Sequence, residues 1–306
     1  MKDLSMIKTM IKKSIGLVLS LTFALFTASN CAIRPIERIK QLKPLLATFT
    51  EDDLVVLDVD YVIMEPETFL KLLYVKTPPC AEKDKSWLKG FYADFYSYCA
   101  SLSRDEYVDL NNYILARVVY ELVEPEIALI IRELQSRGVR VLALTSAKAG
   151  KQETYLGGHR EIILEELRYQ ILSKLGVTFD ISFSGIDPFY LPKSEGGSIA
   201  PYFYKGILFA RENKGDALKA FCEYMQWRPK KIVFVDDAVP YLQQVMWHCD
   251  STEELYCYHY TAAYKKVMNL DHKILLNQLD YLKKHNSFLN RKEMQALMKS
   301  PNLLMY

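Results

Sequence analysis

The chain has 306 residues, of which 50% are hydrophobic and 25% charged, and its formal net charge is +2. These values are those of an ordinary globular protein, and they exclude a disordered chain, a collagen-like chain and a membrane protein with many spans. The length allows one domain of some size, or a core with a smaller inserted element.

Residues 1–31 are predicted to be a bacterial signal peptide. Four lysines precede an apolar run from Ile15 to Phe26, and small and polar residues follow that run. We therefore expect an exported protein, periplasmic or secreted, with no membrane contact beyond this segment. Two alternatives are an uncleaved anchor that crosses the membrane and a lipid attached to Cys31.

The remainder of the chain, from residue 32, has a formal charge close to zero. Because no basic patch dominates it, we expect no nucleic-acid partner. Its cysteines are widely spaced and odd in number, so they do not indicate a disulfide framework. They are Cys80, Cys99, Cys222, Cys249 and Cys257.

From Asp53 onward, short apolar runs alternate with amphipathic stretches. This alternation predicts an α/β fold, a doubly wound, mainly parallel Rossmann-like sheet with helices on both faces. The runs Leu54–Leu57, Val139–Leu144 and Ile232–Val235 are expected to be central strands because, apart from Arg140, they lack the polar alternation of a half-exposed strand. Helices are expected at 125–136, 160–175, 214–224 and 240–248, followed by a strand at 255–260 and helices at 271–284 and 291–299.

Two segments interrupt this alternation. Residues 65–123 are rich in aromatic side chains at helical spacing, and we expect a small helical cap inserted after the first strand. Residues 32–64 and 124–306 would then form the α/β core. We expect the aromatic side chains of the cap to form a small core within the cap rather than a cage around a ligand. Residues 179–210 contain several glycines and prolines, so they are expected to be loop-rich with a β-hairpin.

Acidic side chains gather at the carboxyl ends of two predicted strands. Asp58 and Asp60 follow the first strand, and Asp236 and Asp237 follow the strand that begins at Ile232. Residues two apart on a strand point the same way, and ligands of open α/β sheets bind at the carboxyl ends of the strands. Four carboxylates in one place would repel one another without a cation, and Mg2+ prefers oxygen ligands. The sequence therefore predicts a Mg2+ site that would also attract a phosphate group.

Four motifs in this order resemble those of the haloacid-dehalogenase-like hydrolases. They are Asp58-x-Asp60-x-Val62, a strand that ends at Thr145, Lys214 at the start of a helix, and a strand that ends at Asp236-Asp237. One such motif is a weak signal, whereas four in order are specific. Two further stretches, 206–215 and 258–263, resemble a branch of exported bacterial proteins of unknown function, the DUF2608-like proteins.

The resemblance implies a Mg2+-dependent phosphatase that acts on a phosphorylated small molecule. Asp58 would attack phosphorus and form an aspartyl-phosphate. Asp60 would protonate the leaving oxygen and then deprotonate the attacking water. Thr145 would donate a hydrogen bond to a phosphoryl oxygen, and Lys214 would neutralise charge on the phosphoryl group. Arg211 is the nearest alternative to Lys214 as this cation.

The same resemblance assigns the Mg2+ ligands. Asp58, Asp236 and the backbone carbonyl of Asp60 would hold the ion, and Asp237 would bind it through water or orient Lys214. An Asp at the second position of the first motif is typical of family members that transfer phosphoryl groups, and dehalogenases lack it. The resemblance thus implies the chemistry but names no substrate.

Other interpretations of these residues stay open. One alternative is a catalytically silent relative that binds a partner through its aromatic cap. Another is an enzyme that uses the same residues to transfer the phosphoryl group to an acceptor other than water. Taken singly, the acidic residues and Thr145 also suit turns and helix caps. His248-Cys249 and Cys257-x-His259 suit tetrahedral Zn2+ in residue type but not in spacing.

Overall fold

The computed structural model describes residues 32–67, 69–71, 86–156, 158–194, 196–248, 252, 254–265 and 271–300. The predicted signal peptide lies outside these residues, as do Cys31, Cys80 and Cys249, so export stays a prediction. No helix in the described ranges is both long and apolar enough to span a membrane.

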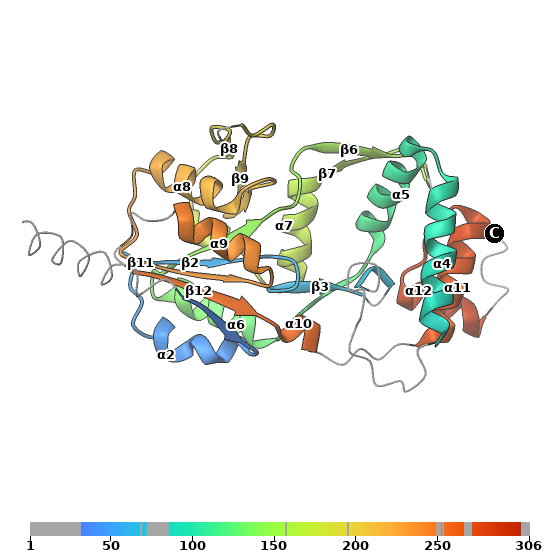
Figure 1. Cartoon of the computed structure of the whole chain (residues 1–306), viewed down its shortest axis with the longest axis horizontal. Coiled ribbons are helices and arrows are strands. Elements are labelled where there is room, and N and C mark those ends of the chain that lie inside the picture. Colours follow the sequence, from blue (N-terminus) through green and yellow to red (C-terminus); the bar gives the residue numbers. More distant parts are fainter. Residues whose placement is uncertain are drawn as a thin grey trace, which may run out of the picture.

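An eight-stranded sheet forms the centre of the larger part of the molecule (Figure 1). Its order is β1 (Ile33–Ile36), β12 (Glu254–Tyr260), β11 (Lys231–Asp236), β2 (Leu54–Leu57), β5 (Arg140–Thr145), β10 (Ile207–Phe209), β9 (Tyr202–Tyr204) and β8 (Phe189–Tyr190). The strands from β1 to β10 are parallel, and β9 and β8 continue the sheet antiparallel. This confirms the mainly parallel sheet. The edge strand β1 was not expected, because only Ile36 of its four residues is buried.

Helices cover both faces of this sheet (Figure 1). One face carries η2 (Ile39–Leu42), α2 (Lys43–Leu46) and α6 (Glu126–Ser136), and the other carries α8 (Lys214–Tyr224) and α9 (Val239–His248). The side chains of β2 point alternately to the two faces of the sheet. Val55 and Leu57 belong to the hydrophobic core under α6, and Leu54 and Val56 belong to the core under α8 and α9. Burial on both sides explains the continuous apolar run, and it confirms the doubly wound α/β fold.

The helix α7 (Leu164–Lys174) begins later than expected. The prediction of a helix from residue 160 was wrong at its start, because β7 (Arg160–Ile163) pairs antiparallel with β6 (Lys151–Thr154). The resulting hairpin reaches away from the sheet to α5 (Arg104–Arg117) (Figure 1). There the Asp109 carboxylate accepts hydrogen bonds from the backbone N–H groups at the end of β6, at 2.7 and 3.2 Å.

The smaller part of the molecule consists of α5 with α4 (Ser86–Ser101), α11 (His272–His285) and α12 (Arg291–Lys299) (Figure 1). Its core contains Phe69, Phe91, Tyr113, Leu279 and Phe288. The Phe69 ring lies 5.6 Å from that of Phe91 and 5.1 Å from that of Phe288, between ring centres. Aromatic residues of the predicted cap therefore do form a core. The C-terminal helices complete this core, although the sequence grouped them with the α/β layer.

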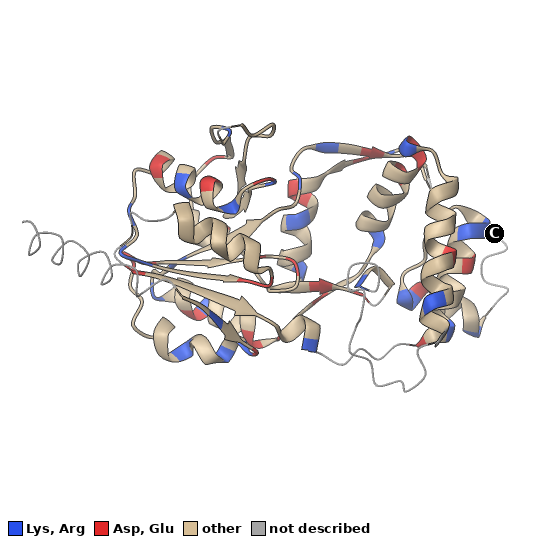
Figure 2. Cartoon of the chain, in the orientation of Figure 1, with Lys and Arg blue, Asp and Glu red and all other residues tan. Residues whose placement is uncertain are grey.

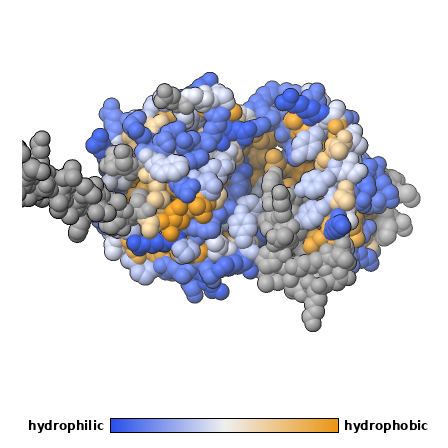
Figure 3. Space-filling model, viewed as in Figure 1, coloured by the Kyte–Doolittle hydropathy of each residue, from blue (hydrophilic) through white to orange (hydrophobic). Residues whose placement is uncertain are grey.

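Two short strands, β3 (Met64–Pro66) and β4 (Tyr120–Leu122), carry the chain between the two parts. Glu65 and Lys71 form a buried ion pair at this connection. Figure 3 shows a hollow between the parts, with hydrophobic residues inside it. Figure 2 shows basic and acidic residues interspersed over both parts, with no face of a single sign in that view.

Candidate active site and metal centre

The carboxyl end of β2 lies where the connections of the sheet change direction. From β2 the chain continues to β5 and β10 on one side, and it then returns to β11 and β12 on the other. Such a point leaves a crevice outside the strand ends, where open α/β sheets bind ligands. Asp58 directly follows β2, and Thr145 and Asp236 are the last residues of β5 and β11. The sheet therefore brings these predicted site residues to one edge.

A buried ionic group occupies this edge. The Lys214 Nζ lies 2.7 Å from Asp58 Oδ1 and 2.7 Å from Asp236 Oδ2. None of the three side chains is more than 7% exposed. A buried charge without a partner costs several kcal/mol, so each of these charges depends on the others.

The start of α8 positions Lys214. The side chain of Asn213 caps the helix by accepting hydrogen bonds from two backbone N–H groups of the first turn. The backbone N–H of Lys214 donates to Gln244 Oε1 of α9 at 3.0 Å. Its Nζ also lies 4.4 Å from the centre of the Tyr241 ring. These contacts aim the ammonium group at the ends of β2 and β11.

Three carboxylates of this edge form a set suited to a divalent cation. Asp58, Asp236 and Asp237 each offer an oxygen, and these oxygens lie within 4.8 Å of one another. The Ala238 N–H donates to Asp236 Oδ1 at 2.8 Å, and the Tyr264 hydroxyl donates to Asp237 Oδ2. Tyr264 thus orients Asp237. The side chains that contact Lys214 are those of Asp58 and Asp236, whereas Asp237 was one of the residues expected to orient it. An all-oxygen donor set with fixed carboxylates fits Mg2+.

The electrostatics of this group also favour a bound cation. Burial is the main cause that raises the pKa of Asp58 to about 7, while Lys214 opposes the rise and Asp236 adds to it. Burial likewise raises the pKa of Asp236 to about 6 and that of Asp237 to about 7. Burial alone would lower the pKa of Lys214, but the two carboxylates hold that pKa above its ordinary value. One ammonium for three carboxylates leaves the group short of positive charge.

Asp60 faces a space next to this group. Its Oδ1 accepts a hydrogen bond from Arg168 Nη1 of α7 at 2.7 Å. The period-two spacing predicted that Asp58 and Asp60 face one site. The strand ends at Leu57, and the chain then turns with Tyr61 in the left-handed region at a φ of 63°. Besides burial, the Asp60 charge contributes to the raised pKa of Asp58, and Asp60 also lines the pocket described next, which Asp58 does not.

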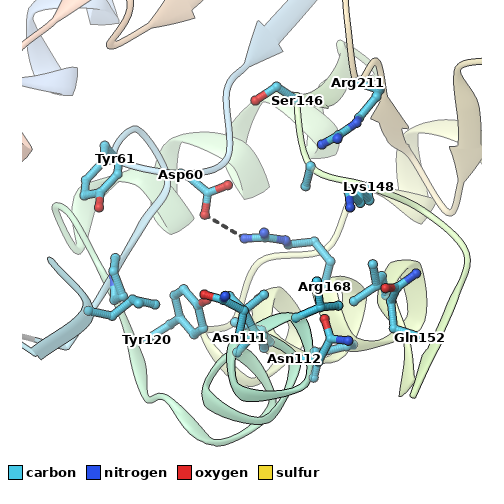
Figure 4. A pocket seen from close by; sticks show the side chains of 18 of the residues that line it. Asp60, Tyr61, Asn111, Asn112, Tyr120, Ser146, Lys148, Gln152, Arg168 and Arg211 are labelled. Carbon is cyan, nitrogen blue, oxygen red and sulfur yellow. Dashed lines mark hydrogen bonds and ion pairs between the residues drawn. The ribbon is translucent and has the colours of Figure 1, made fainter. Parts of the chain in front are cut away.

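A pocket of about 570 Å³ opens beside Asp60, between the strand ends, α7 and α5 (Figure 4). Arg168, Lys148 and Arg211 line it, so Arg211 belongs to the pocket and not to the buried group around Lys214. The rest of its lining includes both polar and apolar or aromatic side chains. The polar ones include Asn111, Asn112 and Gln152, and the others include Leu70, Leu115, Leu164, Leu167 and Tyr120. The pocket is large enough for a small organic molecule.

Thr145 lies at the end of β5, beside this pocket's Ser146. Its side chain is buried, and its Oγ1 accepts a hydrogen bond from the Ala147 N–H at 3.1 Å. A hydroxyl that accepts one hydrogen bond can still donate its own hydrogen. The position agrees with the predicted role but serves equally to fix the turn after β5.

Sequence reasoning missed Arg168, Gln244 and Tyr264. Arg168 and Asp60 are 108 positions apart, and an arginine on an amphipathic helix gives no local sign of such a partner. Tyr264 directly follows the stretch 258–263 that resembles the DUF2608-like proteins, which was the one available signal.

The residues considered for Zn2+ have other partners. His248 Nδ1 lies 2.7 Å from Asp216 Oδ1, and His259 Nε2 lies 3.0 Å from the Asp237 carbonyl oxygen. Cys257 packs in the core between the sheet and α8. Cys249 lies outside the described residues, and within them the carboxylates at the β2 edge are the one group found that could hold a metal.

Comparison with known proteins identifies the family. A family model described as a protein of unknown function (DUF2608) matches residues 35–295. The chain belongs to the DUF2608 family. The matched range contains the buried ionic group, Asp60, Arg168 and Tyr264, so the whole candidate site is part of the DUF2608 region. Comparisons with curated proteins and with solved structures gave no match. None of these comparisons links the chain to the haloacid-dehalogenase-like hydrolases, so that resemblance rests on the sequence motifs alone.

Proposed function

We propose that the protein is a Mg2+-dependent phosphatase that hydrolyses phosphomonoesters through an aspartyl-phosphate on Asp58. The observation that carries this proposal is the buried contact of Lys214 with Asp58 and Asp236, with the oxygen of Asp237 close by. A structural ion pair would need one acid for one base. Two buried carboxylates on one ammonium, with the half-buried carboxylate of Asp237 close to them, instead suit a site that binds a cation and an anion together.

The residues at the edge fit Mg2+, and Asp58, Asp236 and Asp237 would hold it. The bound ion would stabilise the charge of the phosphoryl group and shield it from the carboxylates. The raised pKa values of these carboxyl groups support this assignment, because burial without a cation makes their charged forms costly.

Asp58 has the environment of a nucleophile. Lys214 donates to its Oδ1, which holds the carboxylate in place and supports its charged form. In the first step a carboxylate oxygen of Asp58 forms a bond to phosphorus, and the bond from phosphorus to the ester oxygen breaks. Lys214 and the Thr145 hydroxyl would interact with the phosphoryl oxygens, where negative charge is concentrated.

Asp60 would move the protons. It stands between the buried group and the pocket, so its carboxyl group can reach a leaving oxygen that points into the pocket. It would give that oxygen a proton, and it would later take one from the water that attacks phosphorus. The second attack releases phosphate and restores the Asp58 carboxylate. Arg168 would act as a positioning residue, since its guanidinium group fixes Asp60 Oδ1.

A catalytically silent protein that binds a partner through the aromatic cap is the competing proposal. Phe69, Phe91 and Phe288 are buried in the core of the smaller part, which leaves them unavailable as a docking surface. Tyr96 and Tyr107 of the cap are exposed, so a docking surface would depend on these side chains and not on the buried rings. Phosphoryl transfer to an acceptor other than water would proceed through the same Asp58 intermediate.

The proposal is tested by phosphate release from p-nitrophenyl phosphate with and without Mg2+. We expect turnover that requires Mg2+ and falls by at least about 10³-fold in Asp58→Asn, because the variant lacks the nucleophile. Asp94→Asn is the matched control, since Asp94 is an exposed residue of α4 that does not line the pocket. Absence of Mg2+-dependent turnover across a broad panel of phosphomonoesters would reject the enzyme.

A further inference from the structure

The residues that line the pocket beside Asp60 include more basic than acidic side chains. Asp60 is the sole acidic residue among the described residues that line it, and Arg168 is paired with Asp60. Lys148 and Arg211 line the same pocket, and neither forms an ion pair or a side-chain hydrogen bond within the described part of the chain. Two cations therefore line the pocket without an ion pair among the described residues, and the charge of Arg211 also acts on the neighbouring Glu212 carboxylate, whose pKa is lowered chiefly by its hydrogen bond from Ser198.

These two cations stand apart from the buried group that would bind the phosphoryl moiety. Lys148 lies three residues after the end of β5, and Arg211 lies two residues after β10. Since β10 is the second strand from β2, and neighbouring strands are about 4.8 Å apart, the end of β10, which Arg211 follows, lies roughly 10 Å from the end of β2. Asp58, Lys214 and Asp236 are not among the pocket's lining residues.

The pocket has two chemically different sides. Figure 4 shows Lys148 and Arg211 on the side of the loops after β5 and β10, with Arg168 pointing between them and Asp60. The opposite side is formed by α5 and β4, which contribute Leu115 and Tyr120 and also the amides of Asn111 and Asn112. A molecule in this space would meet cations on one side and a mixture of apolar surface and amide groups on the other.

We propose that the substrate is a phosphomonoester whose leaving group has an apolar or aromatic body and a second anionic group, a carboxylate or phosphate, bound by Lys148 and Arg211. This substrate class rests on the proposed function, because it places the reacting phosphoryl group at Asp58. The apolar body lies against α5 and β4. The second anion faces the two unpaired cations, where charge-assisted hydrogen bonds are strongest.

The test compares two ligands that differ only in the second anion. Phenylphosphonate and 4-carboxyphenylphosphonate have a P–C bond in place of the ester, so their affinities are measured by calorimetry, with Mg2+ present, independently of turnover. The 3-carboxy isomer is included to vary the position of the carboxylate. We expect at least one carboxylated ligand to bind about 10-fold tighter than phenylphosphonate, the gain typical of a hydrogen bond to a charged group.

The double variant Lys148→Gln with Arg211→Gln should lose this preference and keep the affinity for phenylphosphonate. Lys174→Gln with Arg228→Gln is the matched control, because it removes the same charge from exposed residues outside the pocket and should keep the preference. The proposal is overturned if no carboxylated ligand binds tighter, if none of the ligands binds, if the preference survives in the double variant, or if that variant weakens all ligands equally. Equal weakening would assign both cations to the phosphoryl group.

The same measurements separate this inference from the proposed function. If the carboxylate preference is found and then lost in the double variant, the second anion site stands even where no phosphomonoester is hydrolysed. If p-nitrophenyl phosphate is hydrolysed and the preference is absent, the phosphatase stands and the substrate class is wrong.

Discussion

At the scale of single residues, the candidate site depends on charges that are buried together. Lys214 contacts Asp58 and Asp236 at 2.7 Å, and all three are removed from water. Removal of one partner from such a group leaves an uncompensated charge, which typically costs 3 to 5 kcal/mol. The same closeness of carboxylates gives the site its demand for a cation.

The raised pKa values of the site carboxyl groups predict how the stability of the fold depends on pH. The carboxyl groups of Asp58 and Asp237 have folded-state pKa values of about 7, against an ordinary value of 3.8. Without metal, their contribution to stability is full below about pH 4 and is lost as pH rises through about 7, because the unfolded chain ionises them more easily. Mg2+ bound as proposed would reverse this trend, since it requires the ionised forms.

We therefore predict that stabilisation by Mg2+ grows with pH. Melting temperatures measured with and without saturating Mg2+ should differ by roughly 5 °C at pH 8 and by clearly less at pH 6. Asp237→Asn should reduce the difference at pH 8, whereas the exposed Asp94→Asn should not. Equal shifts at both pH values, or an effect of Asp94→Asn as large as that of Asp237→Asn, would show that the ion binds elsewhere.

The sequence predicted some of these residues and not their partners. Asp58 and Asp236 could be located because each follows an apolar run, and the carboxyl ends of parallel strands meet at one edge. The pairing of Asp60 with Arg168 could not be predicted from the sequence, because it depends on where α7 packs after the β6–β7 hairpin. A contact between distant segments leaves no periodic pattern in either one.

At the scale of elements, the close approach of α8 and α9 decides where Lys214 points. A Cβ atom at Gly215 would lie well inside van der Waals contact with the backbone carbonyl of Gln244 in α9. The absence of a side chain at this position lets the first turn of α8 press against α9. The backbone N–H of the adjacent Lys214 can then donate to Gln244 Oε1, and its Nζ can reach Asp58.

Gly215→Ala should consequently weaken both the fold and the site. We expect a loss of about 1 to 3 kcal/mol in the free energy of unfolding, because the helices must separate, and a lower turnover as Lys214 moves. Urea denaturation and the p-nitrophenyl phosphate assay measure the two effects. The control is Gly90→Ala in α4, where the added methyl group meets open space and should stabilise the helix by up to about 1 kcal/mol. Unchanged stability of Gly215→Ala would refute the role of this contact.

The elements that sequence predicted well are those buried on a regular face. The strand β2 and the helix α8 agree with their expected ranges, 54–57 and 214–224. Strands with little burial were missed: β6 and β7 are mostly exposed, and only Ile162 of β7 is buried. Such strands depend on docking to α5, and their own pattern is close to that of a polar helix.

At the scale of the whole molecule, the smaller part is assembled from three separate stretches of chain. Residues 67–117 supply α4 and α5, the hairpin 151–163 packs against α5, and the C-terminal helices complete the core. The sequence assigned only the first stretch to this part. It predicted the C-terminal helices but grouped them with the α/β core, because neither α11 nor the hairpin carries a sign of its partner. Through α5, this part contributes one wall of the pocket beside Asp60.

The central claim is that Asp58 carries the phosphoryl group during turnover. It is tested most directly by mixing the mature protein with p-nitrophenyl phosphate and Mg2+, quenching with acid within the first turnover, and reducing with borohydride. Reduction converts an aspartyl-phosphate to homoserine, which peptide mass spectrometry locates. We predict homoserine at position 58, requiring Mg2+ and absent from Asp58→Asn. Turnover that leaves position 58 unmodified, or a phosphoryl group trapped on another residue, would contradict the account.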